Sequence, residues 1–321
     1  MTINAASNEE IIAGRKFREE ILAGLKNSPK SLPSKYFYDK NGDVLFQQIM
    51  ACPEYYLTKC ELEIFREKSS ELVRAMQGVE IFDIIELGAG DATKSFYLLN
   101  ELTEQEAQFH YYPIDISYNI LEILKEDLKQ KLPTLEVTAL HGEYLEMLSK
   151  VSNNSKHRKV ILFLGSNIGN MTVDEARGFC KEVRSQLQPG DMFLIGFDLK
   201  KNPEVILKAY TDREGLTSQF NLNLLYRINS ELGANFAINQ FRHYQNYDPE
   251  TGACKSYLVS LCAQNVTVAT EDIGFKKDEV IYWRYLRSIA SKTLQSLRAS
   301  RVFQQDYLIS TARAGLLTAF G

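Results

Sequence analysis

The stretch Ile81-Phe-Asp-Ile-Ile-Glu-Leu-Gly-Ala-Gly-Asp91 decides the fold of this chain. Four of its first five residues are apolar, a pattern typical of a parallel strand that is covered on both faces. Gly88 and Gly90 follow, and glycine permits the positive φ and the close backbone approach that a ligand-binding turn needs. The stretch therefore predicts a buried strand that leads into the binding loop of a nucleotide-type cofactor.

The next strand narrows the choice of cofactor. A dinucleotide fingerprint has a third glycine, and Asp91-Ala-Thr-Lys-Ser95 opens the following helix without one, which disfavours NAD. Phe109-His-Tyr-Tyr-Pro-Ile-Asp115 is a second apolar strand that ends in an acid. In a doubly wound sheet this acid lies beside the glycine turn, where a carboxylate can accept two hydrogen bonds from a ribose diol. Asp115 is therefore the candidate ribose ligand; a cap on the following helix is the alternative.

Three further strand-like runs end at the same predicted edge. The run from Glu136 ends in Glu143 and Tyr144, an acid and a ring that suit the edge and face of an adenine. A surface acid and a half-buried ring are the alternative for this pair. The run from residue 159 ends in Gly165-Ser-Asn-Ile-Gly-Asn170, and the run from residue 191 ends in Asp198.

Composition limits the class of protein. The chain has 321 residues, 45% of them hydrophobic and 24% charged, which favours a globular protein of two domains. A net charge of −4 disfavours nucleic-acid binding. Five cysteines without a C-x-x-C pair and four histidines without ligand spacing predict reduced thiols and no metal. No signal peptide or apolar run of membrane length is present, so we expect a cytoplasmic protein without membrane attachment.

The alternation of strands and helices stops near residue 199 and returns late. Helices are predicted over 203–210 and 217–232, and hairpin-like strands over 241–252 and 255–262. A helix over 291–300 and strands over 303–311 and 315–321 follow. We therefore expect a catalytic domain that is interrupted by an inserted lid.

Several blocks together carry a family resemblance. The blocks are Pro33-Ser-Lys-Tyr-Phe-Tyr-Asp39, Pro53-Glu-Tyr-Tyr-Leu-Thr58, Glu86-Leu-Gly-Ala-Gly90, Pro113-Ile-Asp-Ile-Ser117, Leu164-Gly-Ser-Asn-Ile-Gly-Asn170 and Ile228-Asn-Ser-Glu-Leu-Gly-Ala234. With these blocks the sequence resembles the ergothioneine-pathway histidine Nα-methyltransferase family, whose fungal relatives methylate a prenylated tryptophan. The resemblance implies an α/β fold: a Rossmann-like class I S-adenosylmethionine-dependent methyltransferase core over 60–199 plus 286–321. It also implies a second, α+β substrate-binding domain over 8–59 plus 200–285.

The resemblance also implies roles for single residues. It puts Tyr38, Gly88, Lys94 and Asp115 on S-adenosylmethionine, and Glu143 and Tyr144 at its adenine, with Glu143 where the family more often has aspartate. Tyr55, Asn170 and Tyr210 fall where the family holds the amino and carboxylate groups of the substrate. The alternatives are a turn aromatic for Tyr55, a helix cap for Asn170 and a buried helix face for Tyr210.

The substrate pocket departs from the family pattern. The Glu and Ser that bind an imidazole in the histidine enzymes fall near Arg284 and Leu286, and residues 281–290 contain no acid. An imidazole N–H without its acceptor would cost about 1–3 kcal/mol. The neighbouring rings, Trp283 among them, form either an aromatic pocket or strand packing. Trp283 and Arg284 are candidate substrate-binding residues, and the substrate is histidine or another amino acid, aromatic ones included.

We therefore expect an S-adenosylmethionine-dependent N-methyltransferase that acts on the α-amino group of an amino acid. Tyr55, Asn170 and Tyr210 would align an uncharged amine with the methyl group, and Asp198 or water would take the proton. Two alternatives are a non-catalytic S-adenosylmethionine-binding partner subunit and a nicotinamide-dependent oxidoreductase. We expect a monomer or a weak homodimer.

Overall fold

The computed structural model describes residues 8–76, 81–288, 305–310 and 314–320. For residues 8–11, 283–287 and the last two strands, only the backbone is described. Contacts divide the chain into two compact units. The larger unit comprises Met50–Ala209, Asp248–Ala253 and Tyr285–Gly321, and the smaller unit comprises Met1–Ile49, Tyr210–Tyr247 and Cys254–Arg284.

An eight-stranded sheet forms the centre of the larger unit, in the order β13-β14-β7-β6-β2-β3-β4, with β5 also paired to β3. The strands from β7 to β4 run parallel, whereas β14 is antiparallel to both β7 and β13. From β2 the chain moves outward to β3 and β4, then returns to β6 on the other side. Such a reversal is where doubly wound sheets bind ligands. The strands are β2 (Phe82–Leu87), β3 (Phe109–Asp115), β4 (Glu136–Val137), β5 (Leu140–His141), β6 (Arg158–Phe163), β7 (Met192–Asp198), β13 (Gln305–Ser310) and β14 (Ala314–Phe320).

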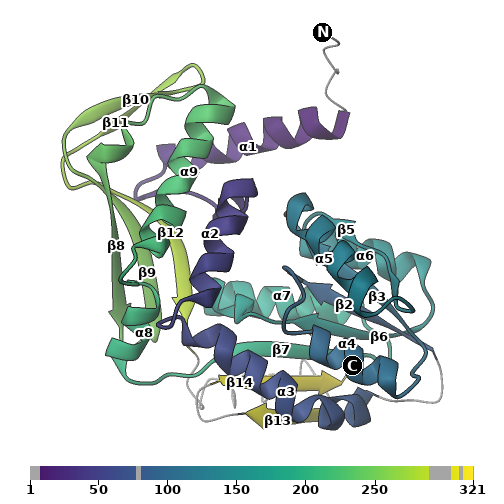
Figure 1. Cartoon of the computed structure of the whole chain (residues 1–321). Helices are drawn as coiled ribbons and strands as arrows, with labels where there is room; N and C mark the ends of the chain where they lie inside the picture. The colour runs from purple at the N-terminus through teal and green to yellow at the C-terminus, as the bar shows by residue number, and fades with distance from the viewer. Residues whose placement is uncertain (1–7, 77–80, 289–304, 311–313, 321) are drawn as a thin grey trace. The chain divides into compact units, whose positions relative to one another are not determined.

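Helices cover both faces of this sheet. Figure 1 shows α3 and α4 on one face and α7 on the other. The α7 helix begins at a capping box in which Thr172 and Glu175 bond each other's backbone amides, and it buries Phe179, Cys180 and Val183 toward the sheet. All six residues of β2 are buried, as expected for a strand covered on both faces. The helical elements are α3 (Tyr56–Met76), α4 (Phe96–Glu104), α5 (Tyr118–Lys131), α6 (Tyr144–Asn154), η2 (Asn167–Asn170), α7 (Val173–Ser185) and α8 (Pro203–Ala209).

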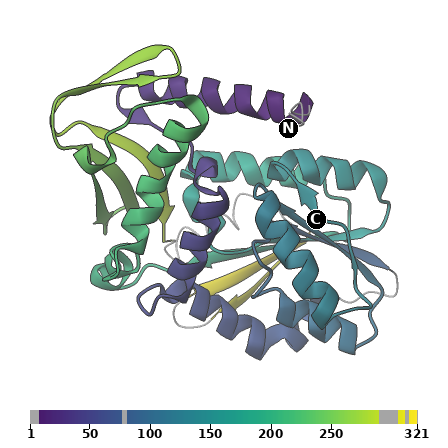
Figure 2. The same ribbon diagram turned by 45° about the horizontal axis from the view of Figure 1, so that its top comes forward.

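The smaller unit has a four-stranded sheet in the order β1-β12-β9-β8 and a separate β10–β11 hairpin. In Figures 1 and 2 α1 lies beside this hairpin, where Arg18 Nη2 donates to Thr270 Oγ1 at 3.4 Å and Lys26 pairs with Glu271. The elements are α1 (Asn8–Lys26), β1 (Lys30–Ser31), η1 (Ser34–Phe37), α2 (Lys40–Ala51), α9 (Leu216–Leu232), η3 (Ile238–Gln240), β8 (Phe241–Asp248), β9 (Ala253–Ser260), β10 (Gln264–Val268), β11 (Glu271–Phe275) and β12 (Val280–Arg287).

The predicted elements are largely confirmed. The expected helices correspond to α8 and α9, the expected hairpin to β8 and β9, and the two late strands to β13 and β14. The helix expected over 291–300 lies outside the described residues. Assignment of a substrate domain and a lid stays a prediction. In the described part of the chain, no helix is long and apolar enough to cross a membrane.

Candidate functional site

The glycine loop follows β2 with the expected backbone. Gly88 has φ of 75° and Gly90 has φ of 56°, both in the left-handed region that favours glycine. A Cβ atom on Gly88 would lie 2.8 Å from Tyr144 Oη and 3.0 Å from Asn167 Nδ2. Glycine at position 88 therefore meets two needs, the backbone conformation and the space. Its lack of a side chain lets Tyr144 and Asn167 lie close to the loop.

The register of the sheet brings Asp115 to the same place. Leu87 of β2 pairs with Ile114 of β3, so Asp115, the last residue of β3, lies beside the glycine loop. Its Oδ2 accepts a hydrogen bond from the Gly90 amide at 3.0 Å. A carboxylate is the acceptor that suits the hydroxyl groups of a diol.

The helix that follows is not capped by Asp115. The cap of α5 is Ser117, whose Oγ accepts a hydrogen bond from the Ile120 amide at 3.2 Å. Asp115 Oδ1 instead accepts from the Ser117 amide at 2.9 Å, which fixes the carboxylate. The helix-cap alternative for Asp115 is therefore wrong.

The third strand end adds Glu143 and Tyr144. The Gly142 amide donates to the Asp115 carbonyl at 3.0 Å, so the start of α6 lies at the same edge of the sheet. Glu143 is exposed, whereas Tyr144 is half-buried and meets Phe163 edge to face, with ring centroids 5.6 Å apart. An exposed acid and a fixed ring therefore lie beside Asp115.

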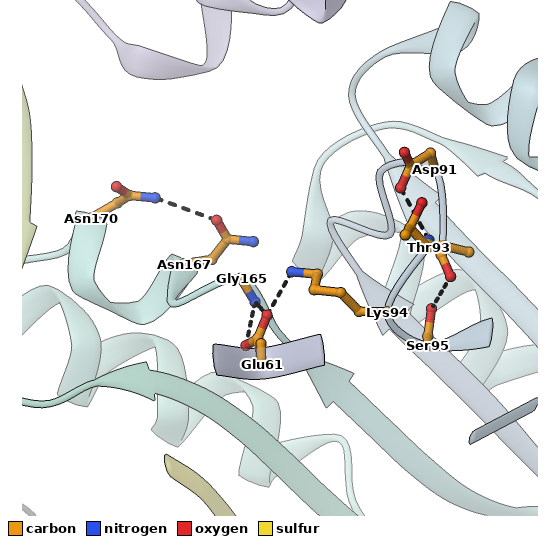
Figure 3. Close-up of polar contacts among 9 residues, drawn as sticks. Glu61, Asp91, Thr93, Lys94, Ser95, Gly165, Asn167 and Asn170 are labelled. Atoms are coloured by element: carbon orange, nitrogen blue, oxygen red, sulfur yellow. Dashed lines mark hydrogen bonds and ion pairs between the residues drawn. The ribbon is translucent and has the colours of Figure 1, made fainter. Parts of the chain in front are cut away.

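An ion pair and its hydrogen bonds join helix α3 to the loops that follow β2 and β6 (Figure 3). Lys94 Nζ lies 2.6 Å from Glu61 Oε2, and the Gly165 amide donates to Glu61 Oε1 at 2.8 Å and Oε2 at 3.0 Å. The side chains are 6% exposed for Glu61 and 19% for Lys94. Burial lowers the pKa of the Lys94 ammonium, but the charge and hydrogen bond of Glu61 help to raise it above its ordinary value. Lys94 is therefore a fixed cation at the start of α4.

Asn170 ends the short η2 helix after β6. Its Nδ2 donates to Asn167 Oδ1 at 3.5 Å (Figure 3), while its Oδ1 is buried and accepts no hydrogen bond from any described residue. The cap of α7 is Thr172, whose Oγ1 accepts from the Glu175 amide, so the cap alternative for Asn170 is wrong. Buried acceptors are normally hydrogen-bonded, so a donor from a ligand or from water would satisfy this oxygen.

Glu86 lies under the glycine loop as the last acid of β2. It is 2% exposed, and Tyr111 Oη donates to its Oε2 at 2.6 Å. Burial raises the pKa of this carboxyl to about 7, against the opposing effects of hydrogen bonds from Tyr111 and Ser95 and the charge of Lys94. Its protonation therefore changes close to neutral pH.

The end of β7 carries a second polar cluster. Asp198 Oδ2 accepts from Tyr56 Oη at 2.7 Å and from Ser288 Oγ at 2.8 Å, and Lys201 pairs with the same carboxylate. Lys201 Nζ also donates to Tyr56 Oη at 3.0 Å. Asp198 thus faces three protein donors, and Tyr56 is the neighbour in sequence of the substrate candidate Tyr55.

The larger unit brings most of the predicted residues to one edge of the sheet. Four candidates belong to the smaller unit, Trp283 and Arg284 among them; Tyr38 packs its ring against Phe46 and Phe220, and Tyr210 is buried. The side chains of Trp283 and Arg284 lie outside the described residues. Those on the larger unit are Tyr55, Gly88, Gly90, Lys94, Asp115, Glu143, Tyr144 and Asn170.

Sequence reasoning missed Glu61. The signal was present, because Glu61 shares a helical stripe with the buried residues Leu57, Ile64 and Phe65, where an acid is out of place unless it is paired. The described residues hold no group of three or more His, Cys, Asp and Glu that suits a metal ion.

The polar groups at this edge fit a nucleoside that carries an amino acid. Asp115 offers acceptors for a diol, Lys94 offers a cation for a carboxylate, and the glycine loop admits a close approach. The sheet order and these groups fit an S-adenosylmethionine-dependent methyltransferase of the Rossmann-like class. A family model described as "Histidine-specific methyltransferase, SAM-dependent" matches residues 17–312, and the chain belongs to this family.

Curated relatives agree with the family model. A histidine N-alpha-methyltransferase of Mycolicibacterium smegmatis is 35% identical over 261 residues, which cover 81% of this chain and 80% of that protein. A histidine N-alpha-methyltransferase of Mycobacterium tuberculosis is 34% identical, over 80% of this chain and 78% of that protein. A 4-dimethylallyltryptophan N-methyltransferase of Claviceps fusiformis is 29% identical, over 60% and 56%. The chain is thus an S-adenosylmethionine-dependent amino acid N-methyltransferase, as the sequence predicts, and not an oxidoreductase or a silent subunit.

Proposed function

We propose that the enzyme methylates the α-amino group of its amino acid substrate, with Asn170 as an acceptor for an amine N–H. The buried Asn170 Oδ1, which has no donor among the described residues, is the observation that carries this proposal. An unsatisfied buried acceptor costs about 1–3 kcal/mol, so a bound amine gains by supplying the missing hydrogen bond. Tyr55 and Tyr210 complete the proposed substrate-binding set.

On the cofactor side, we assign Asp115 to the ribose diol, Glu143 and Tyr144 to the adenine, and Lys94 to the carboxylate. Gly88, Gly90 and Tyr38 complete this set. The proximity of Asp115 to the Gly90 amide, at 3.0 Å, supports a single binding edge. When bound, S-adenosylmethionine supplies a methyl group on a positively charged sulfur, which is already a good leaving group.

The protein's own task is alignment. An uncharged amine must present its lone pair to the methyl group, and holding it at near-attack distance supplies several kcal/mol of the barrier. Asn170 would fix one N–H and so direct the lone pair. We assign the released proton to water, because Asp198 already faces Tyr56, Ser288 and Lys201.

We further propose that the substrate carries an aromatic side chain other than imidazole. Residues 281–290 contain no acid to accept an imidazole N–H, and they include the aromatic pair Tyr282-Trp283. Tyr282 is half-buried and contacts Tyr257 across the sheet of the smaller unit, with ring centroids 5.7 Å apart. Trp283 and Arg284 remain our candidates for contact with the side chain.

Mass spectrometry tests this proposal. Purified enzyme is incubated with S-adenosylmethionine and each amino acid separately, and products are fragmented to locate the methyl group. We expect one or more methyl groups, each replacing a hydrogen, on the α-nitrogen of an aromatic amino acid. Methylation of histidine alone would overturn the choice of side chain, and methylation away from the α-nitrogen would overturn the reaction.

The remaining expectations rest on composition. We propose that the enzyme acts in the cytoplasm, as a monomer or weak homodimer, and that it binds no nucleic acid, because its net charge is −4. Sedimentation at micromolar concentrations tests the oligomeric state, and a gel-shift titration tests nucleic-acid binding.

A further inference from the structure

We propose that Glu61 is a positioning residue. Its carboxylate holds the cofactor-binding cation, Lys94, and the substrate-binding loop that begins at Gly165 in one fixed arrangement. Its carboxylate holds Lys94 on one side and the Gly165 amide on the other (Figure 3). The inference rests on the proposed contact between Lys94 and the cofactor.

Burying the Glu61 carboxylate costs free energy unless the carboxylate is paired. Glu61 is 4% exposed and lies on the apolar stripe of α3 with Leu57 and Ile64. A carboxylate in such a place must be paired and hydrogen-bonded. Glu61 meets both conditions through Lys94 and Gly165.

The neighbouring strand leaves room for this carboxylate. A Cβ atom on Gly196 of β7 would lie 2.2 Å from Glu61 Oε1 and 3.2 Å from the Leu164 Cα. Gly196 is not among the glycines of positive φ, so its lack of a side chain is explained by space. The sheet is thus shaped around the Glu61 carboxylate.

The hydrogen bonds continue from Glu61 to the substrate candidate. Gly165 begins the turn after β6, and Asn167 lies two residues further on. Asn167 accepts a hydrogen bond from Asn170, and its Nδ2 would lie 3.0 Å from a Cβ atom on Gly88. Glu61 therefore fixes Lys94 and, through Gly165 and Asn167, the asparagine whose Oδ1 would receive the amine.

The charge of Lys94 depends on the groups that face it. These are Glu61 from α3, Glu86 from β2 and Asp91 from the glycine loop. Burial disfavours the charged ammonium, and among these three acids Glu61 favours it most. Without the Glu61 carboxylate, the pKa of Lys94 falls, and the cation is lost at a lower pH.

Calorimetric binding of S-adenosylhomocysteine between pH 7 and pH 9.5 tests the role. Glu61→Gln removes the charge, and Glu63→Gln is the matched control, because Glu63 is exposed on the same helix. We expect wild type and Glu63→Gln to have the same pH profile. Glu61→Gln should bind about 10-fold more weakly at pH 7, the effect of one charge-assisted hydrogen bond, and its affinity should fall further relative to wild type as the pH rises toward 9.5. An unchanged pH profile for Glu61→Gln overturns the proposal.

Two further variants separate the possible failures. Lys94→Met should weaken binding by a similar factor at every pH between 7 and 9.5; unchanged affinity would overturn the proposed role of Lys94 itself. Weak binding by Lys94→Met with a wild-type profile for Glu61→Gln would overturn only the role of Glu61. Glu61→Asp keeps the charge but draws the carboxylate back, so we expect a flat pH profile with affinity reduced about 3-fold. Wild-type affinity in Glu61→Asp would contradict the positioning role even if Glu61→Gln failed to fold.

Discussion

Gly196→Ala should destabilise the protein through the Glu61 carboxylate. Alanine within a strand is normally favoured over glycine by about 0.5–1 kcal/mol. Here the new Cβ would lie 2.2 Å from Glu61 Oε1, so the carboxylate must leave Lys94 and Gly165. Breaking a buried ion pair costs about 3–5 kcal/mol, and the strand preference offsets part of this cost. We expect a net loss of about 2–4 kcal/mol in the free energy of unfolding.

A double-mutant cycle isolates this cause. Urea denaturation would be measured for wild type, Gly196→Ala, Glu61→Ala and the double variant. Once Glu61→Ala has removed the carboxylate, Gly196→Ala should cost about 1 kcal/mol or less, since only the 3.2 Å approach to Leu164 remains. The coupling between the two sites should then be about 2–3 kcal/mol, and additivity within about 0.5 kcal/mol would refute the reasoning.

A control glycine has open space around it. Gly178 lies within α7, and a Cβ there would meet nothing within 4 Å. Gly178→Ala should therefore stabilise the protein by up to about 1 kcal/mol, the helix preference of alanine over glycine. The opposite signs at Gly178 and Gly196 would show that the clash, and not the loss of glycine as such, sets the result.

Three further predictions concern the site. Asn170→Ala should lower kcat/KM for the amino acid about 10–100-fold and leave S-adenosylhomocysteine affinity unchanged in calorimetry, whereas equal losses in both would contradict its substrate role. Asp115→Asn should weaken S-adenosylhomocysteine about 10–100-fold, and wild-type affinity would remove the ribose assignment. Burial raises the pKa of the Glu86 carboxyl from 4.5 to about 7. The protonated carboxyl therefore makes its full contribution to the free energy of unfolding below pH 4.5, and this contribution is lost as the pH rises through 7. In urea denaturation, Glu86→Gln should therefore gain about 3 kcal/mol relative to wild type between pH 4.5 and pH 8, and a constant difference would refute the shift.

The sequence predicted the parts of the site that depend on local order. The buried run of β2, the glycine turn and the distance to Asp115 are fixed by strand length and by parallel pairing, which both leave a pattern in the chain. The order of the sheet then follows from the alternation of strands and helices. These features can therefore be predicted without coordinates.

The sequence did not predict the groups that support these residues. Glu61 meets Lys94 and Gly165 only when α3 packs on the sheet, and each partner comes from a different loop. The cluster around Asp198 joins Tyr56 and Ser288, which are far apart in the chain. Such contacts depend on helix packing and on side-chain length, for which a single sequence carries no periodic signal.

The pairing of β14 with β7 has a consequence for synthesis of the chain. Synthesis of β7 ends at Asp198, but β14, its antiparallel partner, begins only at Ala314. At a synthesis rate of about 5–20 residues per second, this edge of β7 stays unpaired for on the order of ten seconds, while most of the smaller unit is made. An open strand edge is a template for pairing with other chains, so nascent or C-terminally clipped molecules should be the ones that aggregate.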